Sequence, residues 1–297
     1  MSSIFSLPSA VGEALDKSDG RPLRQLGTTR NKVLVEDVND VPDDAEYIAI
    51  KGSAKNLERL AKLNQLVAVW SSQPTRDFFR ACAHAPHLRA LYSIYFKQLG
   101  EVDLAGANSL EHLALDWATR LVDLSFLADL PALRTLIIDD MKRLDLNTMP
   151  ELPQLTGLAI GGGINSTMKV QSLEPLSRLP NLQYLSMYSI RSADGSLKPI
   201  SRLRNLREIK LPNYFSVDEF ARLANALPNT KGAVLTPFFT PTDGSVNIAF
   251  WGCTKCHVQR YMMTGKPAVI LCPECDKAKM DKRIARWEAA RASRWPA

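Results

Sequence analysis

Four of the five cysteines lie close together near the C-terminus, in two pairs. They read Cys253-x2-Cys256-x15-Cys272-x2-Cys275, and two C-x2-C pairs separated by about 15 to 20 residues are the spacing of a structural zinc site. Thiolates at positions i and i+3 of a tight turn can occupy two corners of a tetrahedron, and a turn at 264–266 allows a hairpin to bring the second pair alongside. The four cysteines are therefore predicted ligands of Zn²⁺.

Other chemistry for these residues is less consistent with the sequence. Cys253-Thr-Lys-Cys256-His257 spells the C-x-x-C-H haem-attachment motif, but this would leave the second cysteine pair without a role and would require export. The first twenty residues lack the basic start and long apolar core of an export signal. A RING-type ligase would require more ligands than the cysteines and His257 supply. The fifth cysteine, Cys82, is interpreted as a small buried hydrophobic residue.

The residues after Cys272 predict a helix that holds the second cysteine pair. Pro273 suits the first turn, and Met280, Ile284 and Trp287 form an apolar stripe at helical spacing. The segment of about residues 249 to 292 resembles a treble-clef or zinc-ribbon finger. That resemblance implies the ligands but not the role, because such fingers bind nucleic acid, bind proteins or only stabilise a fold.

The predicted helix is basic. Residues 251–297 contain 10 Lys and Arg against 4 Asp and Glu, which accounts for the whole net charge of +6. If the module binds nucleic acid, the residues expected to contact phosphate are Lys279, Lys282, Arg283 and Arg286. A solvated or protein-docking helix face explains the same residues, because the charge is modest and no aromatic and basic RNA motif accompanies it. Both interpretations stay open at this stage.

Most of the remaining chain repeats the pattern L-x-x-L-x-L. Clear copies begin at Leu110, Leu133, Leu155, Leu182 and Leu206, and degenerate copies begin at Ala45, Leu66, Leu88 and Thr230. The start-to-start spacings are 21, 22, 22, 23, 22, 27, 24 and 24 residues, within the range of about 20 to 29 that leucine-rich repeats show. Between copies, apolar residues recur at every third position, which favours coils with short 3₁₀ turns over an array of α-helices.

Residues 45 to 236 resemble the leucine-rich-repeat family, specifically its short bacterial type of about 22 residues. The resemblance implies an α/β fold, a curved solenoid with a parallel β-sheet on its concave side, and protein recognition as the usual role. One feature departs from the family: the inward Asn after each strand is missing, so the turns are expected to be less regular. The residues at this position are Phe96, Ala118, Met141, Gly163, Ile190 and Tyr214.

These patterns predict four segments. They are an N-terminal cap over 1–44, the solenoid over 45–236, a linker over 237–250, and the zinc finger with its basic helix over 251–297. The run Val33–Val35 is the expected strand of the cap, since an open solenoid end would expose core. The Gly-rich segment 161–169 of the longest repeat is expected to protrude as a loop.

Alternation along each strand directs three columns of side chains onto the concave sheet. Trp70, Tyr92 and Ile94 fall on adjacent coils, with Asp116 and Asp139 beside them. Exposed aromatic clusters of this kind are typical of interfaces, although a covering cap would make them core instead. The predicted partner-binding residues are Trp70, Tyr92, Ile94, His112, Asp116, Asp139, Tyr184 and Tyr188.

We therefore expect a non-enzymatic module that holds another protein on its concave face, as an adaptor or as an inhibitor or immunity protein. The alternative is a nucleic-acid-associated regulatory factor that uses the basic finger. No Ser nucleophile elbow, nucleotide loop or H-E-x-x-H motif is present. No apolar run approaches the roughly 18 residues that span a bilayer, and the clustered cysteines suit a metal site better than disulfides, so a cytoplasmic location without membrane contact is expected.

Overall fold

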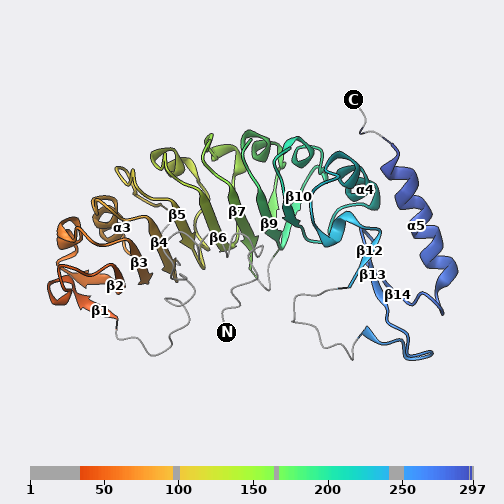
Figure 1. Ribbon diagram of the computed structural model, residues 1–297, viewed down its shortest axis with the longest axis horizontal. Coiled ribbons are helices and arrows are strands. Elements are labelled where there is room, and N and C mark those ends of the chain that lie inside the picture. The colour runs from red at the N-terminus through yellow and green to blue at the C-terminus, as the bar shows by residue number, and fades with distance from the viewer. Residues whose placement is uncertain (1–33, 96–100, 164–166, 241–250, 294, 296–297) are drawn as a thin grey trace.

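The computed structural model describes residues 34–95, 101–163, 167–240, 251–293 and 295. The repeats form an arc, with strands along its inner side and short helical segments along its outer side (Figure 1). The inner strands make one parallel sheet in the order β1-β2-β3-β4-β5-β6-β7-β9-β11. The parallel sheet on a concave face is the arrangement that the leucine repeat predicts.

The strands of this sheet are β1 (Val35–Asp37), β2 (Tyr47–Lys55), β3 (Ala68–Ser72), β4 (Ala90–Ile94), β5 (His112–Leu115), β6 (Thr135–Met141), β7 (Gly157–Gly162), β9 (Tyr184–Tyr188) and β11 (Glu208–Lys210). From β2 to β11 the register follows the repeat. The same position of every coil lies opposite its equivalent, so that Trp70 pairs with Tyr92 and Ala49 with Trp70. The leucines of the pattern form one continuous core, and Leu113, Leu136 and Leu158 are at most 1% exposed.

The outer side is mainly 3₁₀-helical, as the period of three predicts. The segments are η1 (Val38–Asp40), η2 (Leu57–Lys62), η3 (Ser125–Asp129), η4 (Leu146–Thr148), η5 (Glu174–Arg178), η6 (Ile200–Arg202) and η7 (Ala233–Leu235). Two coils instead contain an α-helix, α3 (Arg76–Ala83) and α4 (Val217–Ala226). Each has a side-chain cap, because Thr75 Oγ1 accepts from the Phe78 amide and Ser216 Oγ from the Glu219 amide. Cys82 is buried in α3, as expected.

The turns after the strands are more regular than the missing Asn suggested. In successive coils, the residue that follows the last concave-face side chain of the strand has a left-handed backbone conformation. The values of φ are 53° at Gln73, 61° at Tyr95, 60° at Trp117 and 56° at Asp140. Backbone bonds between neighbouring coils replace the Asn side chains. The Gln73 amide donates to the Ile94 carbonyl at 2.9 Å, and the Ala118 amide to the Asp139 carbonyl at 3.0 Å. The position of the missing Asn is thus free to hold core residues such as Ala118.

The longest repeat corrects one expectation. Part of segment 161–169 is not a protruding loop, because Gly161 and Gly162 extend β7 and Met168 begins β8 (Met168–Val170). This strand pairs in parallel with β10 (Ile190–Ser192) of the next coil. The extra residues therefore provide a second, small sheet, while residues 164–166 lie outside the described part of the chain.

Both ends of the solenoid are continued by strands. β1 adds to the sheet edge beside β2, whereas Val33 and the preceding residues of the predicted cap lie outside the described residues. At the other end, the segment predicted to be a linker begins with β12 (Phe238–Phe239), which pairs antiparallel with β13 (Tyr261–Met263). The hairpin continues to β14 (Ile270–Leu271) and then to α5 (Lys277–Arg291). Residues 241–250 are not described.

Helix α5 begins later than Pro273 predicted. Residues 273–276 form a turn, in which Asp276 Oδ2 accepts from the Cys272 amide at 3.2 Å, and the helix follows from Lys277. The apolar stripe is present, because Met280 and Trp287 are 5% and 1% exposed. No helix in the described ranges is long and apolar enough to cross a membrane.

Candidate functional site

The four cysteines of the predicted zinc site come together at one end of the molecule. Their Sγ atoms all lie within 4.8 Å of one another. Cys253 Sγ is 3.8 Å from Cys275 Sγ, and Cys256 Sγ is 3.4 Å from Cys272 Sγ. Tetrahedral coordination with Zn–S bonds of about 2.3 Å requires S–S separations of about 3.8 Å. The donor set and its spacing therefore fit a tetrahedral thiolate site.

Two turns of similar design position the cysteines. In the first, the Cys253 carbonyl accepts from the His257 amide and the Cys253 amide donates to the Val258 carbonyl, at 2.9 and 2.8 Å. In the second, the Cys272 carbonyl accepts from the Asp276 amide at 2.9 Å, and the Cys275 amide points at Cys272 Sγ at 3.4 Å. The hairpin β13–β14 ends directly at Cys272, and α5 starts just after Cys275, so local backbone hydrogen bonds place both pairs.

The electrostatics at Cys253 favour the thiolate. Hydrogen bonds from the amides of Cys256 and Lys255 lower the pKa of Cys253 to about 6. The thiol of Cys275 has its pKa raised to about 12, first by its hydrogen bond to Cys256 and then by burial. All four are free thiols, at separations well beyond the about 2.05 Å of a disulfide. A divalent cation would stabilise the thiolate form of every cysteine that binds it, including Cys256 and Cys275, whose pKa values are raised in its absence.

The basic residues predicted to contact phosphate divide into two kinds. Arg286 forms two bonds to Asp218 of α4, with Nε–Oδ1 and Nη2–Oδ2 distances of 3.1 and 2.9 Å. Arg283 Nη2 donates to the carbonyls of Thr264 and Gly265 at 3.2 and 3.0 Å. Lys279 and Lys282 are exposed, although Lys279 Nζ lies 3.7 Å from Asp276. The two arginines thus contact the protein itself.

On the concave face, the predicted aromatic residues lie side by side. The rings of Trp70 and Tyr92 are stacked, with centroids 6.4 Å apart and planes 17° apart. Register brings them together, since these residues are directly paired on β3 and β4. Ile94 follows Tyr92 on the same face of β4, and all three side chains are half-buried. This is a compact apolar surface with some exposure left for a partner.

Two carboxylates lie next to these rings. Tyr92 Oη donates to Asp116 Oδ2 at 3.5 Å, and Asp139 occupies the equivalent position of the next coil. Burial, followed by the charge of Asp116, raises the pKa of Asp139 to about 7. Burial also raises the pKa of Asp116 and that of the Tyr92 hydroxyl. Neither carboxylate has a cationic partner in the described part of the chain.

His112 departs from the expectation of an exposed contact. It is 3% exposed, and its Nδ1 lies 2.7 Å from Oγ1 of the equally buried Thr135 on the next strand. Other members of its column, such as Ala68 and Ala90, are also buried. His112 therefore links adjacent coils.

Tyr184 and Tyr188 lie apart from the other predicted contacts, on β9, and both are half-buried. Gly161 makes room for Tyr188: a Cβ on this glycine would lie 2.0 Å from Tyr188 Cε1. The two residues are paired on β7 and β9, so the tyrosine ring lies across the glycine of the neighbouring strand. The structure thus separates the predicted residues into a group on β3 to β6 and a second group on β9.

Two aromatic residues outside the three predicted columns complete the first group. Tyr95 and Trp117 pack edge to face with centroids 4.4 Å apart, and Tyr95 is 40% exposed. Both are the left-handed residues that follow Ile94 and Asp116. Their separation of one repeat, 22 residues, was the signal available in the sequence. We call the set Trp70, Tyr92, Ile94, Tyr95, Asp116, Trp117 and Asp139 the aromatic–acidic surface.

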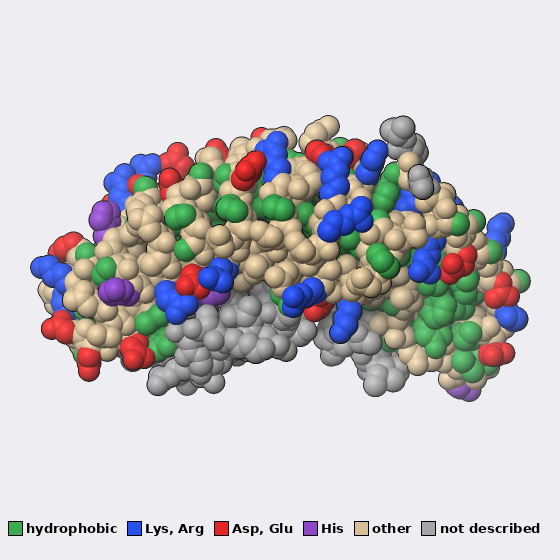
Figure 2. Space-filling view, turned by 45° about the horizontal axis from the view of Figure 1, so that its top comes forward, with side chains coloured by type: hydrophobic (Ala, Val, Ile, Leu, Met, Phe, Trp, Pro, Cys, Tyr) green, Lys and Arg blue, Asp and Glu red, His purple; other side chains and the backbone are tan. Residues whose placement is uncertain are grey.

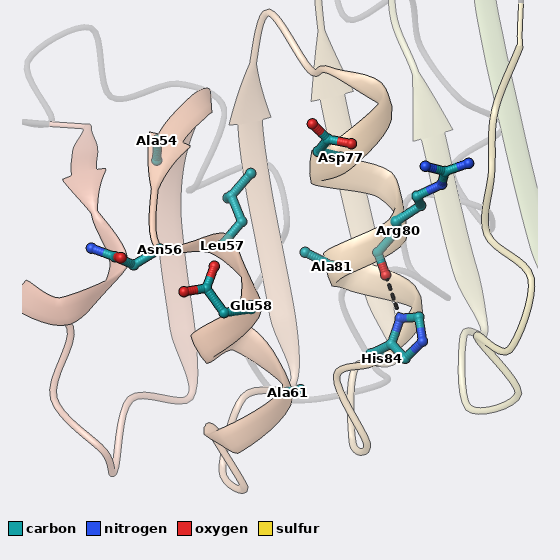
Figure 3. Close-up of a pocket in the computed structure, with 9 residues that line it drawn as sticks. All are labelled: Ala54, Asn56, Leu57, Glu58, Ala61, Asp77, Arg80, Ala81 and His84. Atoms are coloured by element: carbon teal, nitrogen blue, oxygen red, sulfur yellow. Dashed lines mark hydrogen bonds between the residues drawn. The ribbon is translucent and has the colours of Figure 1, made fainter.

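The outer side of the arc contains a hollow of about 580 Å³ between η2 and α3. It is lined by Ala54, Asn56, Leu57, Glu58, Ala61, Asp77, Arg80, Ala81 and His84 (Figure 3). Its cationic groups are engaged, since Arg80 Nε donates to Asp103 Oδ2 and His84 Nδ1 lies 2.7 Å from the Arg80 carbonyl. We assign it no role. The four cysteines are the one group of at least three close metal-ligand side chains among the described residues.

Side chains of both charges are scattered over the face shown in Figure 2, without a continuous basic stripe. Hydrophobic side chains gather at the C-terminal end of this view. In the cysteine-containing segment, Phe238, Tyr261 and Ile284 are partly buried against a small core of Met263, Leu271 and Met280. Charge therefore does not single out this face as a nucleic-acid surface.

No protein-family model matches the chain, and no curated protein matches it. Among solved structures, an internalin (inlF) from Listeria monocytogenes is 17% identical, with a TM-score of 0.47 over 63% of this chain and 59% of its own. An internalin C2 from the same organism is 18% identical, with a TM-score of 0.33 over 59% of this chain and 63% of its own. An LRR protein of Leptospira interrogans is 19% identical, with a TM-score of 0.42 over 59% and 50%.

The chain spans less than two thirds of the length of these three proteins. At these values the similarities carry no argument about function. The description of the chain as a parallel leucine-rich solenoid rests on its own repeats, strands and register.

Proposed function

We propose that this chain is a non-enzymatic protein-binding module that holds a partner against the aromatic–acidic surface, as an adaptor or an inhibitor. The observation that supports this most directly is the stacked pair Trp70 and Tyr92 beside Asp116 and Asp139 on the concave sheet. Rigid aromatic side chains contribute large contact areas at small entropic cost and dominate many interfaces.

The same residues indicate the partner's charge. Asp116 and Asp139 are mostly buried and have no cationic partner among the described residues. A partly buried carboxylate is stabilised by an opposite charge, and a cation is also attracted to the face of an aromatic ring. The partner is therefore a protein that inserts a Lys or Arg side chain at this surface.

We propose further that the four cysteines bind Zn²⁺. A site with four thiolate ligands has no open coordination position, so the metal would have a structural role. Nucleic-acid binding by α5 is the less favoured function, because Arg283 and Arg286 are engaged within the protein. A cytoplasmic location accords with reduced, metal-binding cysteines.

Substitution of the aromatic pair tests the binding proposal. Trp70→Ala and Tyr92→Ala are each expected to weaken partner capture by about thirtyfold or more, because truncation of an interface anchor costs about 2 kcal/mol or more. The measurement is quantitative co-purification from the native cell at moderate salt, with nuclease present. Tyr214→Ala is the matched control, since Tyr214 stacks with Arg191 near the C-terminal end. Equal capture by wild type and Trp70→Ala would contradict the proposal.

Zinc content tests the metal proposal. The purified chain should contain one zinc ion by elemental analysis, and Cys272→Ser should lose it, since removal of a ligand from a four-ligand site weakens binding strongly. Cys82→Ser is the control, because Cys82 is buried in α3 and is distant in sequence from the four ligands. Retention of a full zinc equivalent by Cys272→Ser would reject the assignment of ligands.

A further inference from the structure

The cysteine module (238–240 and 251–293) packs against the last coil of the solenoid. Helix α5 runs beside α4 at the C-terminal end of the arc (Figure 1). Trp287 and Ala290 of α5 belong to the same continuous core as the leucines of the repeats. Trp287 is 1% exposed, and Phe220 of α4 is fully buried. The module thus covers an apolar end that the solenoid would otherwise expose to water.

A single solenoid side chain fixes the hairpin turn of the module. Asn213 follows β11, and its Nδ2 donates to the Met263 carbonyl at 3.0 Å while its Oδ1 accepts from the Gly265 amide at 2.6 Å. The Lys266 amide adds a bond to the Phe215 carbonyl at 2.9 Å. Gly265 has φ of 82°, and a Cβ there would lie 2.5 Å from the Val217 amide nitrogen. The turn therefore lies directly against the start of α4.

The second contact is made by α5. Arg286 binds Asp218 of α4 through two bonds, and Trp295 Nε1 donates to Glu219 Oε1 at 2.9 Å. Arg283 connects α5 to the hairpin turn through the Thr264 and Gly265 carbonyls. The hairpin leads into Cys272 and the helix follows Cys275. The elements that contact the solenoid are thus the elements that the second cysteine pair joins.

We infer that metal binding by the four cysteines and closure of the C-terminal end of the solenoid are one linked equilibrium. This inference rests on the proposed zinc site. Among the described residues, the module's own hydrophobic cluster has three buried members, Met263, Leu271 and Met280, and so small a core does not hold a hairpin and a helix together without metal. Without metal, Trp287 and the Gly265 turn lose their fixed relative position and leave α4 uncovered. By reciprocity, contacts far from the sulfurs contribute to metal affinity.

The first test measures zinc affinity when a solenoid contact is removed. Asn213→Ala is expected to weaken zinc binding by the full chain about tenfold, because it removes two hydrogen bonds formed only when the module is docked. The measurement is competition with a chromophoric chelator. Asn205→Ala is the matched control: Asn205 Nδ2 donates to the Pro180 carbonyl within the solenoid at 2.9 Å. Its zinc affinity should equal that of the wild type.

The second test measures protection of the solenoid when zinc is removed. Chelation should increase amide hydrogen exchange in α4 and lower the melting temperature, and it should leave β3 and β4 protected below the melting transition. The linkage alone would be overturned if Asn213→Ala bound zinc as tightly as the wild type and chelation left amide exchange in α4 unchanged. A chain that binds no zinc would overturn both the linkage and the proposed metal site.

Discussion

At the scale of the residue, the solenoid accepts polar groups where they form pairs across neighbouring strands. Ser71 and Ser93 occupy positions that hold leucine, isoleucine or methionine in the clear copies, and both are fully buried. They lie opposite each other on β3 and β4, with their hydroxyl oxygens 2.9 Å apart. Each hydroxyl therefore keeps a hydrogen-bond partner, which removes most of the penalty of burying it.

This pairing predicts a coupling between the two serines. Ser71→Ala or Ser93→Ala alone should lower the free energy of unfolding by about 1 to 3 kcal/mol, because the remaining hydroxyl is buried without a partner. The double variant should lose clearly less than the sum of the two single losses. Denaturant unfolding of the four proteins gives this coupling. Strictly additive losses would show that the hydroxyls do not depend on each other.

At the scale of the element, the sequence predicts the features that recur in every coil, and it does not predict those that occur in one or two coils. Period-two alternation and a spacing of about 22 residues predicted the register from β2 to β11, because a slip of one residue would turn every leucine out of the core. The pairing of β8 with β10 was not predictable in this way, since it depends on a single insertion between two coils. The α-helices α3 and α4 also replace the expected 3₁₀ turns, and the side chains of Thr75 and Ser216 cap them.

The candidate site shows the same division. The C-x2-C spacing identified the cysteines, and the structure brings them together. Arg283 and Arg286 were read from the sequence as phosphate contacts, but their bonding to Gly265 and Asp218 depends on how α5 docks, which composition cannot reveal. His112 was predicted to be an exposed contact, because alternation gives the face on which a side chain lies and not how deeply it is buried there.

At the scale of the whole molecule, protonation of a concave-face carboxylate affects both the stability of the fold and the affinity for a cationic partner, so both quantities depend on pH. The pKa of Asp139 is raised from 3.8 to about 7, by burial first and by the charge of Asp116 second, with Asp140 contributing. Between these values the folded chain holds a proton that the unfolded chain has lost. The free energy of unfolding contributed by this group therefore falls as pH rises through this window. A cationic partner has the opposite effect on Asp139, because its positive charge stabilises the ionised carboxylate and so lowers the pKa of this group in the complex.

Asp139→Asn separates these two effects. The variant should be more stable than the wild type, by about 2 kcal/mol at pH 5.5 and about 4 kcal/mol at pH 8, because Asn cannot ionise. Its affinity for the partner should be low at every pH, whereas wild-type affinity should fall as pH decreases below about 7 and Asp139 takes up its proton.

Denaturant unfolding and titration with the captured partner, each at pH 5.5 and at pH 8, measure the stability and the affinity. Asp129→Asn, on the outer segment η3, is the control and should follow the wild type. If Asp139→Asn shows the wild-type pH profile in both measurements, Asp139 neither opposes folding nor contacts a cationic partner.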